Sequence, residues 1–144
     1  MREKIVSGDQ VLEYIPQRPP FVMIDSVYEK GDDFVTSGLT IQEENVMAED
    51  GLFKDGGLIE NIAQTAALYA GTKYKDAGEP IPVGYIAGIK NVKIFRNPEV
   101  GSSIITTTTL TNEMLNIQIV NGEVKDEEGE LVASCELRIF INDK

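Results

Sequence analysis

The sequence predicts an α+β domain in which an antiparallel β-sheet wraps around one long helix. Two observations lead to this fold class. Residues 56–75 carry the one long helical pattern, and the rest of the chain is dominated by short apolar segments with the period of two that is typical of strands. Two of these segments precede the helix and four follow it, an order that favours a single helix packed on one antiparallel sheet.

The predicted helix begins near Gly56 and ends at about Lys75 to Gly78, where glycine and prolines interrupt the pattern. Apolar residues recur on it at helical spacing and form the stripe that we expect to be buried: Ile59, Ile62, Ala63, Ala66, Ala70 and Tyr74. The stripe is rich in alanine, and Gly71 lies near its end. Another backbone can therefore approach this helix closely.

The segment before the helix is expected to contain a short helix at residues 7–14, and prolines break the chain after it. Strands are predicted at residues 21–28 and 34–41 because both segments are apolar and rich in β-branched residues. Residues 42–57 are polar and contain glycine, which predicts a loop.

After the helix, strands are predicted at residues 83–95, 102–110 and 130–141, and a further strand begins at Leu115, where apolar and polar residues alternate. Asn121-Gly122 and Asp126 to Gly129 both offer a hairpin turn; the second is preferred, with Asn121-Gly122 as a bulge in a longer strand. With no linker or repeat, residues 1–144 form one predicted domain. The exposed edges of such a sheet are commonly paired in a dimer.

Composition excludes several functions. The chain of 144 residues has a net charge of −11, which argues against nucleic acid as a partner, because phosphate contacts need clustered cations. It contains no histidine, so neither an imidazole base nor an imidazole metal site can exist, and no metal or cofactor is expected. No apolar run is long enough to span a bilayer and no secretion signal is present, so we expect a cytoplasmic protein. The single Cys135 lies in an alternating strand and is interpreted as a core residue.

Glu60 and Gln64 are the polar residues of the helix that are candidates for a functional role. They are four residues apart and therefore share one face. A carboxylate in a buried apolar helix is costly unless it is paired or takes part in chemistry. The alternative is that Glu60 only favours the N-terminal end of the helix, where negative charge is stabilised by roughly 0.3–1 kcal/mol.

Four cations form a candidate patch for an acidic carrier on this acidic chain: Arg18, Lys90, Lys93 and Arg96. The alternative is that they only solvate the surface of a strand.

Four stretches, in order, resemble the hotdog-fold 3-hydroxyacyl-[acyl carrier protein] dehydratases of type II fatty acid synthesis. Residues 14–27 (Tyr-Ile-Pro-Gln-Arg-Pro-Pro-Phe-Val-Met-Ile-Asp-Ser-Val) resemble the leucine-proline-histidine-arginine-x-proline-phenylalanine motif and the strand after it. Residues 60–64 (Glu-Asn-Ile-Ala-Gln) resemble the glutamate-x-x-alanine-glutamine helix motif. Residues 86–101 resemble the alanine-glycine-isoleucine strand with its arginine-proline turn, and residues 130–137 resemble the last strand. The short segment before the helix is more similar to the branch associated with aryl polyene and flexirubin-type pigments.

The resemblance implies a hotdog fold and an acyl-thioester site without a cofactor. In the family the motif histidine is the catalytic base and faces the helix carboxylate of the other subunit. Here Gln17 stands at the histidine position and Glu60 at that of the carboxylate. Glutamine cannot act as a base near neutral pH, so we expect dehydratase activity to be weak or lost.

The resemblance also suggests the residues that contact the substrate. Gly56 or Gly57 would offer a helix N-terminal N–H to the thioester carbonyl. Phe21 and Tyr85 are candidates for the wall of an acyl tunnel, with ordinary core packing as the alternative, and Gly88 is a place of close backbone approach. Gln64 is expected to hydrogen-bond the loop that carries Gln17.

Three functions therefore stay open from the sequence. The first is a thioester-binding dehydratase homologue with a degraded acid–base pair. The second is a thioesterase that uses Glu60, and the third is a non-catalytic protein, including the non-catalytic subunit of a heterodimeric dehydratase. The expected partners are an acyl thioester of acyl carrier protein or CoA, and a second subunit in a homodimer, a higher homo-oligomer or a heterodimer, with neither nucleic acid nor membrane.

Overall fold

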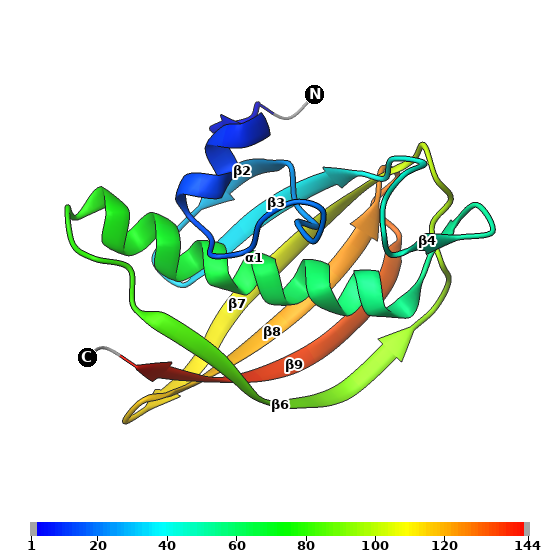
Figure 1. Ribbon diagram of the computed structural model, residues 1–144. Helices are drawn as coiled ribbons and strands as arrows, with labels where there is room; N and C mark the ends of the chain where they lie inside the picture. The colour runs from blue at the N-terminus through cyan, green and yellow to red at the C-terminus, as the bar shows by residue number, and fades with distance from the viewer. Residues whose placement is uncertain (1–2, 143–144) are drawn as a thin grey trace.

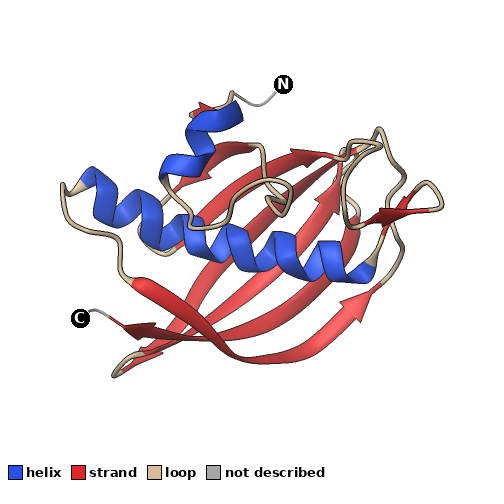
Figure 2. Cartoon of the chain, viewed as in Figure 1, coloured by secondary structure: helices blue, strands red, loops and turns tan. Residues whose placement is uncertain are grey.

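The computed structural model describes residues 3–142 and has one long helix lying across a curved antiparallel sheet (Figures 1 and 2). The elements, in chain order, are β1 (Val6–Ser7), the 3₁₀ helix η1 (Gly8–Glu13), β2 (Ser26–Lys30), β3 (Phe34–Thr40), β4 (Ala48–Glu49), β5 (Leu52–Phe53), α1 (Asp55–Asp76), β6 (Val83–Ile94), β7 (Ser103–Met114), β8 (Ile117–Asp126) and β9 (Leu131–Asn142). This arrangement confirms the predicted fold class.

The main sheet has seven strands in the order β1-β2-β3-β7-β8-β9-β6. All of its pairs are antiparallel, and β4 and β5 form a separate small hairpin just before α1. The sheet curves around α1, so the helix is held on the concave side (Figure 1). None of the helices within residues 3–142 is both long and apolar enough to cross a membrane.

The core lies between α1 and the sheet. Its larger part joins Leu58 and Ile62 of the helix to side chains of β7, β8 and β9. Gly122 allows this close packing, since a Cβ at that position would lie 2.3 Å from the Cγ2 of Ile62. The prediction of a bulge at Asn121-Gly122 is wrong, because both residues pair regularly with β7 and the irregularity lies at Leu110 to Asn112 instead.

The buried face of α1 is more polar than the predicted stripe. Ile62 and Ala66 are buried as expected, whereas Ile59 is only partly covered. Three polar side chains, Asn61, Gln64 and Thr65, are fully buried. The prediction counted apolar residues only, and it therefore missed the face that contacts other parts of the chain through hydrogen bonds.

Residues 21–25 also differ from the prediction, because the strand begins only at Ser26. The chain at Phe21 and Met23 bonds to side chains of α1 instead of to a neighbouring strand. Asp25 ends this segment, where its carboxylate accepts hydrogen bonds from the Thr40 N–H and the Ser26 hydroxyl.

The two edges of the sheet are unequal. β1 covers one edge with two residues, whereas β6 forms the other edge with twelve. The edge strand β6 carries apolar side chains that are each more than a third exposed: Val83, Tyr85, Ile86, Ile89 and Val92. A long apolar edge strand of this kind is a template for pairing with another chain.

Candidate active site

A cavity of about 410 Å³ lies along one side of α1. Three parts of the chain enclose it: the segment from Leu12 to Arg18, the start of β6, and the concave side of β8 and β9. The helix contributes residues from Glu60 to Ala70, which corresponds to about 15 Å of helix at 1.5 Å per residue.

The lining of the cavity divides by chemistry. Glu60 is the first residue of α1 that lines the cavity. Gln17 and Arg18 also line the cavity. Beyond Glu60 the helix presents only small side chains to the cavity: Ala63, Ala66, Ala67 and Ala70. Small helix residues leave open space between helix and sheet, and the opposite wall is built largely from isoleucines of β6 and β9. The result is a largely apolar chamber with the Glu60 carboxylate and the Gln17 amide at one end, and with Glu13 and Gln118 as further polar residues of its lining.

Glu60 does not act as a helix cap. The acidic residue in the first turn is Asp55, whose carboxylate accepts a hydrogen bond from the Asn97 amide at 2.9 Å. Glu60 lies farther along the helix, lines the cavity, and accepts a hydrogen bond from Gln64 Nε2 at 2.9 Å. Of the two interpretations offered by the sequence, the structure therefore disfavours the one in which Glu60 only favours the helix end.

Gln64 makes the bond expected from the sequence, and more. It is fully buried, and its Oε1 accepts from the Met23 N–H at 2.6 Å. Its Nε2 donates to the Phe21 carbonyl at 2.8 Å as well as to Glu60. Both amide hydrogens and the carbonyl oxygen are thus engaged, which orients the Glu60 carboxylate and the Phe21–Met23 backbone together.

Asn61 bonds to the same loop as Gln64, and the sequence did not single it out. It is fully buried, and its Nδ2 donates to the Met23 carbonyl at 2.8 Å. Its Oδ1 accepts from the Thr106 hydroxyl on β7 at 2.5 Å. The available signal was a third polar residue one position after Glu60 in a helix that had to be buried.

Gln17 lines the same cavity as Glu60 within one chain. Its Oε1 is buried without a hydrogen-bond partner in the free chain. Arg18 supports the backbone around it, because Nη1 donates to the carbonyls of Ile15 and Gln17, both at 2.8 Å. Gln17 and Glu60 of one chain therefore line one cavity, whereas the family resemblance pairs the histidine position with the helix carboxylate of the other subunit, and that pairing stays a prediction.

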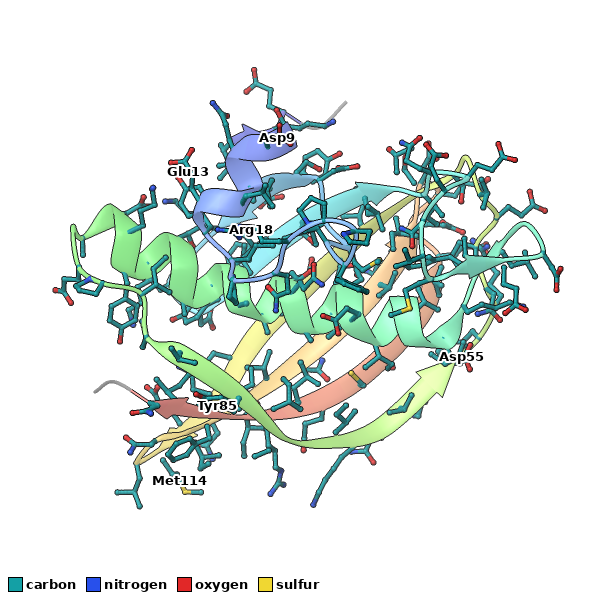
Figure 3. The ribbon with its side chains drawn as sticks, in the orientation of Figure 1. Asp9, Glu13, Arg18, Asp55, Tyr85 and Met114 are labelled. Atoms are coloured by element: carbon teal, nitrogen blue, oxygen red, sulfur yellow. The ribbon has the colours of Figure 1, made fainter. Side chains whose placement is uncertain are left out.

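None of the six predicted substrate residues lines this cavity. Within the described part of the chain, its lining lacks Gly56, Gly57, Gln64, Phe21, Tyr85 and Gly88. The N–H of Gly57 bonds to the Lys54 carbonyl. The Phe21 side chain is exposed, and its backbone carbonyl accepts the hydrogen bond from Gln64. Tyr85 pairs with Phe140, whose neighbours Ile139 and Ile141 line the cavity, so Tyr85 points to the opposite face of the sheet. In Figure 3 Tyr85 lies at the sheet and Asp55 at the start of α1, whereas Arg18 lies over the middle of the helix.

The four cations of the predicted carrier patch have different neighbours in the structure. Arg18 is engaged with the loop described above, and Arg96 pairs with Asp126. Backbone N–H donation, first from Glu130, and the Arg96 guanidinium hold the pKa of Asp126 below its usual range against the effect of burial. Lys90 and Lys93 are exposed on β6, where Lys90 lies opposite Glu136. A shared role in carrier binding stays a prediction.

Cys135 is buried on β9, and burial raises the pKa of its thiol to about 11. A thiol held protonated is a poor nucleophile, which agrees with its interpretation as a core residue. Within residues 3–142 no cluster of three or more acidic or cysteine ligands could hold a metal ion.

A long helix cradled by a curved seven-stranded antiparallel sheet, with a carboxylate at the cavity beside the helix, defines a hotdog-fold protein. The family model described as ApeP dehydratase, ApeP-like, matches residues 9–144. The chain belongs to the ApeP-like dehydratase family.

Curated relatives agree with this assignment. The chain is 32% identical over 140 residues to the 3-hydroxyacyl-[acyl-carrier-protein] dehydratase FabZ of Shewanella baltica (strain OS155), covering 89% of this chain and 87% of the relative. It is 31% identical over 150 residues to FabZ of Shewanella woodyi, covering 95% and 94%.

Solved structures confirm the hotdog fold. The dehydratase heterocomplex ApeI:P from Xenorhabdus doucetiae contains a chain that is similar with a TM-score of 0.83 and 21% identity, over 93% of this chain and 91% of that one. An uncharacterised protein, PH1136 from Pyrococcus horikoshii, is similar with a TM-score of 0.71 and 15% identity, over 97% of both chains.

Proposed function

We propose that this protein binds the acyl group of a thioester in the cavity beside α1 and that its dehydratase activity is weak or lost. The observation that carries the proposal is that Gln17 and Glu60 line one cavity, with glutamine at the position where the family resemblance places the catalytic histidine. The apolar remainder of the chamber suits an acyl chain, and the thioester carrier is acyl carrier protein or CoA.

The chemistry explains the expected loss. Dehydration of a 3-hydroxyacyl thioester removes a proton next to the carbonyl and delivers one to the departing hydroxyl. Glu60 can serve one of these transfers, whereas the amide of Gln17 can only hydrogen-bond. The loss of one positioned acid–base group costs about 10²–10⁴ in rate.

The test is mass spectrometry of a 3-hydroxydecanoyl thioester incubated with the purified protein, scored for the enoyl thioester and for the free acid. We expect a trace of enoyl product or none, and Gln17→His should raise its formation by about 10²–10⁴ if the remaining site is intact. The matched control is Gln17→His combined with Glu60→Gln, which should abolish the gain. Rapid dehydration by the unaltered chain would contradict the proposed loss. Free acid that disappears with Glu60→Gln would make the protein a thioesterase.

A second candidate is the non-catalytic subunit of a heterodimeric dehydratase. The free apolar edge of β6 favours it, because a partner strand could pair there and bring a histidine of its own. The similarity to a chain of the ApeI:P heterocomplex supports the same idea. Native mass spectrometry of the chain alone and of its mixture with a histidine-containing dehydratase subunit from the same genome distinguishes the two assemblies. A stable homodimer that does not exchange subunits would count against a heterodimer.

A further inference from the structure

We propose that Asn61 is a positioning residue of this site, which acts with Gln64 as a two-amide clamp on the backbone of Met23. The clamp determines where the chain from Gln17 to Phe21 lies against the cavity. The inference rests on the proposed function, since it assigns the clamp to the same thioester site.

The clamp holds both polar backbone groups of one residue. The Met23 N–H donates to Gln64 Oε1 at 2.6 Å, and the Met23 carbonyl accepts from Asn61 Nδ2 at 2.8 Å. Met23, Asn61 and Gln64 are all fully buried. A buried backbone group without a partner is costly, and here α1 supplies the hydrogen bonds that a neighbouring strand would otherwise make.

Asn61 is itself held in one orientation. The Thr106 hydroxyl of β7 donates to its Oδ1 at 2.5 Å, so the amide nitrogen faces Met23. Asn61 therefore ties three elements together: the helix that carries Glu60, the middle of the sheet and the loop.

Hydrogen bonds continue from the clamp to Gln17. Gln64 also holds the Phe21 carbonyl, and the Phe21 N–H donates to the Arg18 carbonyl at 3.0 Å and closes a turn. The Arg18 guanidinium in turn holds the Gln17 carbonyl. A shift at Met23 would therefore move the amide that lines the cavity.

Thr65 offers a matched control on the same helix, one turn after Asn61. Its hydroxyl bonds to Ser37 at 2.7 Å and donates to the Asn61 carbonyl, and it is as buried as Asn61. Its side-chain contacts are with β3 and with its own helix. Thr65→Val should therefore weaken the packing of the helix on the sheet without releasing the loop.

Hydrogen exchange tests the clamp directly. We compare the Met23 amide in Asn61→Leu and Thr65→Val at urea concentrations that give both variants the same global stability. The clamp predicts exchange about tenfold faster in Asn61→Leu, because loss of the bond from Asn61 to the Met23 carbonyl loosens the segment, although the Met23 N–H keeps Gln64 as its own partner. Equal exchange in the two variants would show that Asn61 only stabilises the fold and would overturn the proposal. If leucine at position 61 prevents folding, Asn61→Ser, which is too short to reach the Met23 carbonyl, takes its place.

Binding of octanoyl-pantetheine separates this proposal from the proposed function. We expect Asn61→Leu to weaken binding about tenfold and Thr65→Val to leave it unchanged. If the unaltered protein does not bind the probe, the proposed function fails, while the exchange result still decides whether the clamp exists. If the probe binds equally to both variants, Asn61 has no positioning role in the site.

Discussion

The two halves of α1 contrast in what they present to the rest of the chain. Residues 60–65 carry a carboxylate, two amides and a hydroxyl that bond to the loop, to the sheet and to one another. Residues 66–71 are mostly small: Ala66, Ala67 and Ala70 line the cavity and Gly71 allows the backbone at Tyr14 to come close, whereas Leu68 and Tyr69 are buried in the core. The polar half determines geometry, whereas the small half leaves space for a ligand.

The largest expected effect is at Gln64, in the polar half. Gln64→Met keeps the size of the side chain but leaves the Met23 N–H and the Phe21 carbonyl without their partner. At roughly 2 kcal/mol for the buried Met23 N–H and roughly 1 kcal/mol for the part-buried Phe21 carbonyl, we expect a loss of about 3 kcal/mol in the free energy of unfolding, measured in urea. Gln118→Met is the control, because within residues 3–142 the Gln118 side chain bonds only to the exposed Glu113, and its loss should cost less than about 0.5 kcal/mol. Equal losses would show that the hydrogen bonds of Gln64 to the loop contribute no more to stability than that of a partly exposed glutamine on β8.

The next effect is at Gly71, where the small half meets the N-terminal segment. A Cβ at this position would lie 2.0 Å from the Tyr14 carbonyl oxygen. Alanine normally stabilises the interior of a helix by about 1 kcal/mol relative to glycine. Here we expect Gly71→Ala to destabilise the protein by about 2–3 kcal/mol, because the backbone must move.

Gly56→Ala provides the comparison on the same helix. A Cβ there would approach nothing closer than the Met47 sulfur at 3.8 Å, so we expect no loss of stability. The measurement is the thermal unfolding temperature of the two variants. A Gly71→Ala variant that is more stable than the natural protein would contradict the close packing at Tyr14.

Ala67→Leu tests the space that the small half leaves. Ala67 is half-buried and lines the cavity, so a larger side chain can grow into the open volume with little change in stability. We expect binding of a decanoyl thioester to weaken about tenfold and that of a butyryl thioester to change little, measured by calorimetry; the loss corresponds to about two methylene groups at 0.8 kcal/mol each. The control is Ala77→Leu at the exposed end of the helix. Equal weakening for both chain lengths would argue against this location of the acyl chain.

The smallest effect concerns the sheet beneath the polar half, where Cys135 pairs with Gly122 under Ile62. Burial raises the pKa of the thiol from 9.0 to about 11, so the folded protein retains a proton that the unfolded chain releases. The contribution of the neutral thiol to stability is therefore present below pH 9 and is lost as pH rises from 9 to 11. Unfolding free energies of the natural protein and Cys135→Ala, compared from pH 8 to 11, should converge. A constant difference would mean that the thiol is not buried in the folded state.

Several features of the protein could be predicted from the sequence alone. The helical period marked α1, the alternating segments marked the long strands, and the absence of histidine excluded an imidazole base. Gln64 could be assigned to the loop, whereas the pairing of Gln17 with Glu60 between subunits stays a prediction. These features depend on residue identity and on spacing within one element, both of which are visible in the chain.

Other features were decided only by the tertiary structure. Asn61 bonds to residues 38 and 45 positions away, and no local pattern reports such contacts. The segment around Met23 was predicted as a strand from its apolar residues, yet its hydrogen-bond partners are helix amides, which propensity cannot anticipate. In the same way, Tyr85 and Phe21 point away from the cavity, while alanines of α1 line it. Sequence patterns determine which elements form, whereas the packing of distant segments determines which side chains meet at the site.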